Sequence, residues 1–371
     1  MGWDGARVAV LPSGPPMLIH RRRFFLVLGV LAGLCVLSVD AQRATEKLPT
    51  RLTDQEFWSM VLDFSEPNGF FRSDNLLSNE LYFQSVVPEL TRLAVPGRVY
   101  MGVGPEQNFT YMTAVRPKMA FIIDIRRGNR DLQLMYKALF ELSADRAEFV
   151  SRLFARKRPE GLGSKSTVKE IFDAFSSLPS SDAMHDENVK AIRDQLLGKH
   201  ALALSAEEVS GIESVYRAFS TYGPAINYSS SGGFGFSGMP TYADLMTAVD
   251  DAGRSRGYLA TEDAFAWLKG LESKNLVVPL VGDFAGPKAI RSVGEYVKSH
   301  GAMVSSFYLS NVEQFLRQDR SWSRFCGSVA TLPLDETSTF IRATRDLRAY
   351  QGIRLSTVLG SMADETKACD R

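Results

Sequence analysis

The sequence predicts an α/β fold with a mostly parallel sheet, interrupted by a long, mainly helical insertion. Short apolar runs at 98–104 and 119–126 are each followed by a helix-like segment, which is the pattern of strand–helix–strand units. These runs have few polar breaks, as is typical of parallel strands covered on both faces. The same alternation returns at 275–310. With 371 residues, 45% of them hydrophobic, the chain is long enough for a large buried core.

The start of the chain has the features of an export signal over 1–41. Arginines at 21–23 precede an apolar run, and Ala41 offers a small residue for cleavage. The stretch "RRRFFL" resembles a twin-arginine signal, whose route exports folded proteins. We expect the true start at Met17 and an exported protein, periplasmic or secreted. An uncleaved segment would instead anchor the chain in a membrane, although the apolar run is short for a spanning helix.

Residues 42–97 are expected to form N-terminal helices. In "LTDQEFWSMVLDFSE" (52–66), Thr53 and Glu56 have the spacing of a capping box. A second helix would start at Ser78 or Asn79 and use apolar positions as far as residue 90. We therefore interpret "SDNLLSNE" (73–80) as successive helix caps rather than as a segment folded over a ligand.

The predicted sheet is divided by the insertion. Its first half covers 98–143 and consists of "RVYMGVG", "EQNFTYMTAV", "MAFIIDIR" and an amphipathic helix at 129–143. The insertion, 144–256, reads as helices and ends in a glycine-rich loop. In that loop "SGGFGFSGMPTY" is interpreted as a lid, with Phe234 and Phe236 as caps over a pocket.

The second half of the sheet and a C-terminal tail are expected in 257–371. Strands are predicted at 275–286 and 302–310, with a helix between them at 287–301. A short helix follows at "NVEQFLRQ", and a further strand is predicted within "RFCGSVATLPL". A closing antiparallel strand pair is not evident near the C-terminus.

A candidate ligand site lies where the first strand ends, at "GVGPEQNF". Gly102 and Gly104 let a ligand approach the backbone, and the next helix starts near Glu106 and Asn108 with free N–H groups. Asp124 ends the second strand, where a carboxylate can accept hydrogen bonds from ribose hydroxyls. A strand that ends in a glycine pair, followed by a helix and by a second strand that ends in an acid, predicts a nucleotide-like ligand rather than a bare turn.

The details of the loop favour one kind of nucleotide-like ligand. A dinucleotide fingerprint requires a third glycine where this chain has Gln107, and the negative charge of Glu106 disfavours a pyrophosphate at the helix start. A ligand with a cationic amino acid end and a single ribose fits better. NADP stays an alternative, because Arg126 and Arg127 follow Asp124 and can hold a 2′-phosphate; an ordinary carboxylate–arginine pair explains them equally well.

These motifs resemble those of class I S-adenosylmethionine (SAM)-dependent methyltransferases, over 98–142 and 275–335. The resemblance implies a Rossmann-like, doubly wound sheet. It also implies that the loop at Gly102, Gly104, Glu106 and Asn108 lies against the methionine part of SAM, and that Asp124 holds the ribose. The chain also resembles an uncharacterised bacterial Rossmann-like family that carries "GVGPEQNF", "DIRR", "GDFAGPKAIR" and "FYLSNVEQ".

The later motifs extend the same resemblance. Asp283 and Phe284 follow an apolar run in "GDF", the place where the methyltransferase family contacts adenine. The fourth strand of that family ends near the methyl group, so Tyr308, Ser310 and Asn311 would line the reaction centre. Methyl transfer depends chiefly on alignment, so few diagnostic acid–base residues are expected.

Other kinds of function find little support in the sequence. The formal net charge is +1, without the basic excess expected of a nucleic-acid binder. No HExxH or CxxC motif is present, so no metal site is predicted. Cys326 and Cys369 would remain after signal removal, and one bridge between them is left open. A small-molecule ligand is expected, with membrane contact only through the N-terminal signal or anchor.

Three functional hypotheses follow. The first is a SAM-binding, methyltransferase-like enzyme, and the second is an NAD(P)-binding oxidoreductase on the same fold. The third is an exported, non-enzymatic protein with a degenerate Rossmann core. The export signal supports the third hypothesis, because SAM and NADPH are cytoplasmic molecules.

Overall fold

The computed structural model describes residues 47–228, 238–346 and 354–368, all within one unit of the chain, Lys47–Arg371. The expected export signal lies outside these residues, as do the two phenylalanines of the expected lid. Across the described ranges, no helix combines the length and the apolar character needed to cross a membrane.

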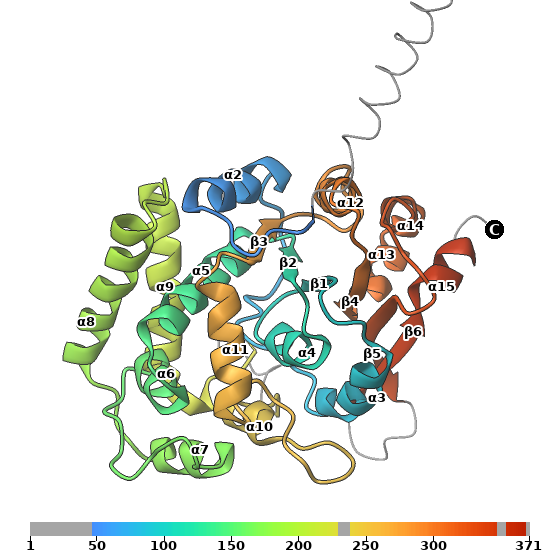
Figure 1. Cartoon of the computed structure of the whole chain (residues 1–371). Coiled ribbons are helices and arrows are strands. Elements are labelled where there is room, and N and C mark those ends of the chain that lie inside the picture. Colours follow the sequence, from blue (N-terminus) through green and yellow to red (C-terminus); the bar gives the residue numbers. More distant parts are fainter. Residues whose placement is uncertain (1–46, 229–237, 347–353, 369–371) are drawn as a thin grey trace, which may run out of the picture. The chain divides into compact units, whose positions relative to one another are not determined.

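A six-stranded sheet runs through the described part of the chain in the order β3-β2-β1-β4-β5-β6 (Figure 1). Strands β1 to β5 are parallel to their neighbours, whereas β6 pairs antiparallel with β5. The predicted α/β class with a mostly parallel sheet is therefore confirmed. The bounds are β1 Val99–Val103, β2 Met119–Asp124, β3 Val277–Val281, β4 Val304–Ser310, β5 Thr339–Asp346 and β6 Arg354–Ser361.

The strand order reverses at β1, which has β2 on one side and β4 on the other. The chain passes through β1, β2 and β3 in one direction and then returns to the other side of β1 for β4 and β5. In an open parallel sheet, loops at the carboxyl ends of the strands diverge at such a reversal and leave a crevice. The end of β1 is therefore the place where the topology provides room for a ligand.

Helices cover both faces of the sheet, which explains the unbroken apolar strands. Figure 1 shows α4 and α11 on one side of the sheet and α12 and α14 on the other. Thr53 and Glu56 form the predicted capping box of α2. The bounds outside the insertion are α2 Asp54–Phe64, α3 Val87–Leu93, α4 Gln107–Val115, α5 Arg127–Leu142, α12 Ala289–Ser299, α13 Val312–Gln318, α14 Trp322–Val329 and α15 Met362–Ala368.

The chain between α5 and β3 is helical wherever it forms regular structure in the described residues. Helix α5 contacts α6, α8, α9 and α11, so it joins this region to the sheet. The bounds are α6 Arg146–Leu153, α7 Val168–Ser176, α8 Asp182–Arg193, π-helix η2 Asp194–Lys199, α9 Ala206–Tyr222, 3₁₀-helix η3 Gly223–Ala225, α10 Tyr242–Thr247 and α11 Glu262–Glu272.

A buried ionic cluster holds the π-helix against α2 and α5. His200 Nδ1 lies 2.6 Å from Asp54 Oδ1, and its Nε2 lies 2.6 Å from Glu141 Oε2. Lys137 donates to Glu141 Oε1 at 2.7 Å. Burial alone would raise the pKa of Glu141, but the hydrogen bonds and charges of His200 and Lys137 outweigh it and lower that pKa to about 2.

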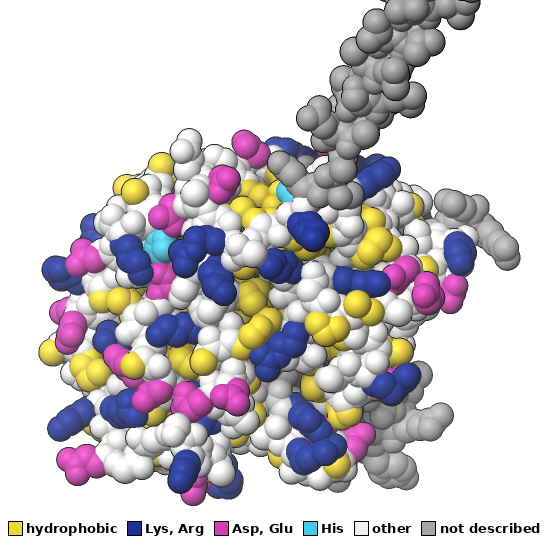
Figure 2. All heavy atoms as spheres, in the orientation of Figure 1, with side chains coloured by type: hydrophobic (Ala, Val, Ile, Leu, Met, Phe, Trp, Pro, Cys, Tyr) yellow, Lys and Arg dark blue, Asp and Glu magenta, His cyan; other side chains and the backbone are white. Residues whose placement is uncertain are grey.

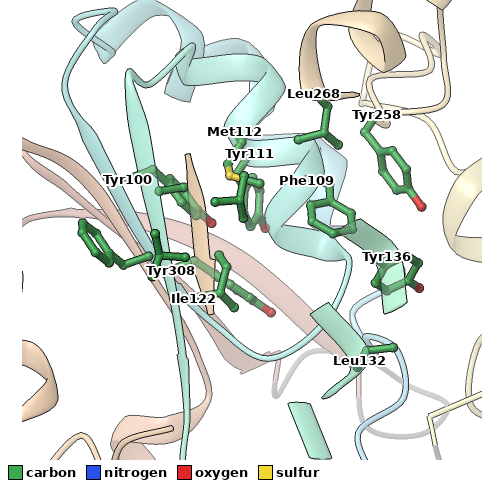
Figure 3. Close-up of a cluster of buried hydrophobic side chains, with 14 of the residues drawn as sticks. Tyr100, Phe109, Tyr111, Met112, Ile122, Leu132, Tyr136, Tyr258, Leu268 and Tyr308 are labelled. Carbon is green, nitrogen blue, oxygen red and sulfur yellow. The ribbon is translucent and has the colours of Figure 1, made fainter. Parts of the chain in front are cut away.

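An aromatic core lies beneath the end of β1. Phe109 of α4 makes edge-to-face contacts with Tyr136 at 5.2 Å and with Tyr258 at 5.3 Å between ring centroids. Figure 3 shows these rings together with Tyr111 and Tyr308, which lie 5.1 Å apart. Because α4 packs on the sheet and against α11, the loop that leads into it has a rigid support.

Two local predictions are wrong. Residues 78–90 do not form one helix that starts at Ser78 or Asn79: a 3₁₀-helix, η1 Phe83–Val86, precedes α3. The polar groups of Ser78 bond to α4 instead of capping a helix. The strand predicted in "RFCGSVATLPL" is largely helix α14, because Phe325, Cys326 and Val329 fall on one buried helical face.

The C-terminal region also differs from expectation. Strands β5 and β6 form an antiparallel pair from Thr339↔Ser361 to Asp346↔Arg354, although the sequence gives no clear sign of one. Thr, Ser and Gly interrupt the apolar pattern of β6, which obscures the strand. Cys326 is disulfide-bonded. Cys369, with which a bridge was left open, lies outside the described residues.

Candidate functional site

A cavity of about 260 Å³ opens at the carboxyl ends of β1 to β4, where the strand order reverses. This pocket is lined by the strand-end loops, by α13 and the start of α14, and by residues of the segment 70–79, which closes it from one side. Its size is near the lower end of small-ligand pockets, which are typically about 300–1,000 Å³.

Most of the predicted site residues line this one pocket. They come from four different strand ends: Gly104 follows β1, Asp124 ends β2, Asp283 and Phe284 follow β3, and Tyr308, Ser310 and Asn311 lie at the end of β4. Gly102, Glu106 and Asn108 do not line it. The sequence thus groups the strand-end residues correctly, while three residues of the glycine loop serve other purposes.

Gly102 makes room for a side chain of the protein itself. A Cβ at this position would overlap Asn108 Oδ1 and lie 3.0 Å from the Tyr100 ring. Asn108 Nδ2 donates to the carbonyls of Val103 at 2.9 Å and Pro105 at 2.7 Å, and its Oδ1 accepts from Tyr100 Oη at 2.9 Å. The pair therefore fixes the turn instead of contacting a ligand.

Gly104 is the glycine of the loop that faces the pocket. Its φ of +75° lies in the left-handed region, which favours glycine. A Cβ here would be 4.0 Å from Asp124 Oδ2, so this carboxylate oxygen points across the gap between β1 and β2. Gly104 and Asp124 are therefore neighbours at the pocket wall.

Asp124 is 4% exposed and is held in place by the start of α5. Its Oδ1 accepts from the backbone N–H of Arg126 at 2.9 Å and lies 3.4 Å from Arg126 Nε. Burial raises the pKa of Asp124, and the charge and hydrogen bonds of Arg126 oppose that rise. One carboxylate oxygen is thus committed to Arg126, and the other faces Gly104 and the pocket.

The two arginines after Asp124 do not line the pocket. Arg126 Nη1 donates to the carbonyl of Asp74, and Arg127 forms an ion pair with Glu207 of α9. Their guanidinium groups therefore brace the segment 70–79 and the insertion. Neither arginine therefore contributes to the pocket lining that a bound 2′-phosphate would contact.

Glu106 is buried in the protein and does not present a charged side chain to the pocket. Burial raises its pKa to about 8, despite a hydrogen bond to its Oε1 from the backbone N–H of Ser78 at 3.2 Å. A pKa near 8 favours the neutral form of the carboxyl group at pH 7. The expectation that its negative charge repels a pyrophosphate is wrong, because it assumed an exposed side chain.

The N-terminus of α4 is nevertheless closed to a phosphate by the chain itself. Ser78 bonds through its backbone to Glu106 and through its hydroxyl to Gln107, in the first turn of the helix. Leu76 of the same segment donates to the carbonyl of Tyr228 at 2.9 Å. The segment 73–80 therefore does fold over the pocket, and its interpretation as successive helix caps is wrong.

The loop after β3 is built around a carboxylate from another element. Glu66 Oε1 accepts from the N–H groups of Lys288 at 2.8 Å and Ala289 at 2.9 Å, at the start of α12. Its Oε2 accepts from the N–H of Asp283 at 3.1 Å. Glu66 thus caps α12 and holds Asp283 and Phe284 at the pocket wall.

Aromatic rings form the remaining walls. Phe284 stacks on Phe325 of α14 with ring centroids 5.8 Å apart and planes 9° apart. Phe71 contacts Phe315 of α13 edge-to-face at 5.2 Å. Phe70, which is 84% exposed, stands at the pocket lining. The pocket therefore combines flat apolar walls with a few directed polar groups, as ligand sites commonly do.

Sequence reasoning missed Glu80, which lies directly behind the pocket wall. Its Oε1 accepts from Tyr308 Oη and from Ser310 Oγ, both at 2.6 Å. The sequence signal was an acidic residue between the apolar pairs Leu76-Leu77 and Leu81-Tyr82, next to the polar Ser78 and Asn79. That signal alone does not show where the carboxylate points.

The part of the surface drawn in Figure 2 mixes both signs of charge over the described residues, with no large single-sign area in this view.

One family model matches the chain: the Domain of unknown function (DUF7790), over residues 76–354. The match covers well over half of the chain and includes nearly all of the pocket. A comparison with curated proteins gave no significant match.

Proposed function

This chain belongs to the DUF7790 family, and we propose that its pocket binds SAM in a Rossmann-like domain of the methyltransferase type. The observation that carries the proposal is the meeting of four strand ends in one cavity, with Gly104, Asp124, Asp283 and Ser310 at its walls. In the family that the sequence resembles, the corresponding positions contact successive parts of SAM.

The sheet topology supports the proposal. The order β3-β2-β1-β4-β5, with parallel neighbours, is consistent with a doubly wound sheet, whose crevice would lie between β1 and β4. The antiparallel strand β6 adds the kind of closing strand that the methyltransferase fold has at this edge.

The pocket walls suggest how SAM would be held. Asp124, with one oxygen facing the cavity, would accept from the ribose hydroxyls. Phe284 and Ile125 would enclose the adenine, and Asp283 lies beside them. Tyr308, Ser310 and Asn311 would then face the end of the ligand that carries the methyl group. When bound, SAM supplies a methyl group on a positively charged sulfur; the protein would position it against an acceptor.

Two features favour SAM over a dinucleotide. Two helix N-termini next to the pocket are occupied: α4 by Ser78 and Glu106, and α12 by Glu66. A pyrophosphate normally binds at such a helix start. Neither Arg126 nor Arg127 lines the pocket, and each bonds to another part of the chain, which disfavours a 2′-phosphate at these residues.

Calorimetric titration of the purified full-length chain tests the proposal. We expect SAM and S-adenosylhomocysteine to bind, and NADPH not to compete with them. Asp124→Asn should weaken both ligands about tenfold or more, because it loses a charged acceptor for the ribose hydroxyls. Asp173→Asn, on an exposed face of α7, is the matched control and should change nothing. Absence of SAM and S-adenosylhomocysteine binding to the wild type would refute the proposal.

A further inference from the structure

Glu80 is a buried carboxylate that lies one hydroxyl group behind the pocket wall. The residue is 1% exposed, and Ser310, whose hydroxyl contacts it at 2.6 Å, lines the pocket. Its neighbours in sequence, Ser78 and Asn79, also line the pocket. The carboxylate is therefore close to any ligand that reaches the end of β4.

The carboxylate is surrounded by hydrogen-bond donors from separate elements. Its Oε1 accepts from the two hydroxyls of β4 already described. Its Oε2 accepts from Gln107 Nε2 of α4 at 2.9 Å and from Thr357 Oγ1 of β6 at 3.3 Å. Hydrogen bonds from four neutral donors to the two oxygens are of the kind that stabilises the negative charge of a carboxylate.

This negative charge is not neutralised by the described part of the chain. No lysine or arginine described here forms an ion pair with Glu80; its partners there are neutral donors. Its charge also affects its surroundings. After burial, which is the main cause, Glu80 contributes to the raised pKa of both Glu106 and Tyr308. A buried charge without a counter-ion is costly, and such charges concentrate at functional sites.

The backbone is also distorted to maintain this arrangement. Ser310 has a φ of +49°, in a region that residues other than glycine seldom adopt, and the register between β4 and β5 shifts between Tyr308 and Ser310. Together these features place both hydroxyls on the same carboxylate oxygen. Strain of this kind persists where surrounding contacts enforce it, commonly at binding sites.

We infer that Glu80 is a fixed negative charge that makes the β4 end of the pocket selective for a cationic group of the ligand. This inference rests on the proposed function, in which that group is the sulfonium of SAM. It deepens the proposal by naming a charge-selective residue outside the glycine loop. Its consequence is discrimination between SAM and S-adenosylhomocysteine, which differ by the methyl group and by the positive charge on sulfur.

Calorimetry with these two ligands at pH 7 tests the inference. The wild type should bind SAM roughly tenfold or more tighter than S-adenosylhomocysteine, as expected for a nearby unit charge in a protein interior. Glu80→Gln should remove most of this preference by weakening SAM alone. Asp124→Asn should weaken both ligands similarly, because both carry the ribose. Glu272→Gln replaces another buried glutamate, whose raised pKa of about 8 already keeps it neutral, and should leave both affinities unchanged.

The outcomes separate this inference from the proposed function. If the wild type binds neither ligand, the proposed function fails and the inference fails with it. If the wild type binds both ligands equally well, the inference is overturned while the proposed function stands; this comparison needs no variant and so does not depend on how Glu80→Gln folds. An equal loss of both ligands in a folded Glu80→Gln protein also overturns it, since a structural role would not distinguish charge.

Discussion

Replacing Glu106 by glutamine should stabilise the protein at neutral and alkaline pH. The carboxyl group is fully buried, and one of its oxygens, Oε2, has no hydrogen-bond partner. Glutamine has the same shape, keeps an acceptor for the Ser78 N–H and cannot ionise. The substitution therefore removes a titration while preserving the contacts of α4 with the segment 73–80.

The magnitude follows from the pKa of Glu106, which is raised from 4.5 to about 8. A group whose pKa is raised on folding gives its full contribution to stability below pH 4.5, and that contribution is lost as the pH rises towards 8. Since a tenfold change in an acid dissociation constant corresponds to about 1.4 kcal/mol, the wild type should lose up to about 3 kcal/mol between pH 5 and pH 8 through this residue. Glu106→Gln should not show this part of the loss.

Urea unfolding at several pH values between 5 and 8 measures the effect. The difference in unfolding free energy between Glu106→Gln and the wild type should grow with pH in favour of the variant. Glu272, whose pKa is also raised to about 8, contributes a similar slope to both proteins and cancels in the difference. A difference that stays constant across this range would show that Glu106 does not titrate as a buried acid, and would refute the reasoning from its burial.

Two further changes probe the supports of the pocket and of the insertion. Gly102→Ala should lower the unfolding free energy by about 1–3 kcal/mol, because the new Cβ displaces Asn108 from the turn; Gly128→Ala, which meets no atom within 4 Å, is its control in a thermal melt. Glu141→Gln should flatten acid unfolding followed by circular dichroism. The pKa of about 2 means that Glu141 stabilises the fold above pH 4.5 and loses this effect as the pH falls towards 2. Exposed Glu187→Gln should leave the acid curve unchanged, and an unchanged curve for Glu141→Gln would contradict the role given to the His200 cluster.

The strands of the sheet centre were predictable because burial on both faces leaves a plain mark in sequence. In β2, every residue from Met119 to Asp124 is buried, and only the last is polar. The strand-end positions follow from topology, since parallel strands bring their carboxyl ends to one edge. The capping box at Thr53 and Glu56 was also predictable from the sequence, because both of its hydrogen bonds join residues only three positions apart.

The parts that could not be predicted depend on contacts across long stretches of chain. Thr357 reaches Glu80 over 277 residues, and Tyr308 reaches it over 228. No local pattern encodes such a meeting. The same holds for Glu106, whose sequence position at a helix start suggests exposure, whereas the segment 73–80 buries it. Gly102 looked like a ligand contact because sequence cannot show that Asn108 fills the space beside it.

Glu66 and the segment 73–80 place the protein's own polar groups at two helix starts beside the pocket. Most nucleotides carry phosphates, and a phosphate binds favourably at the N-terminus of a helix. Here a carboxylate occupies that place at α12, and Ser78 with Glu106 occupies it at α4. Because these two helix starts are already bonded to the protein's own side chains, a phosphate could bind at either one only by displacing them. Under the proposed function, these two occupied helix starts would disfavour phosphorylated nucleotides, separately from any group that recognises the ligand.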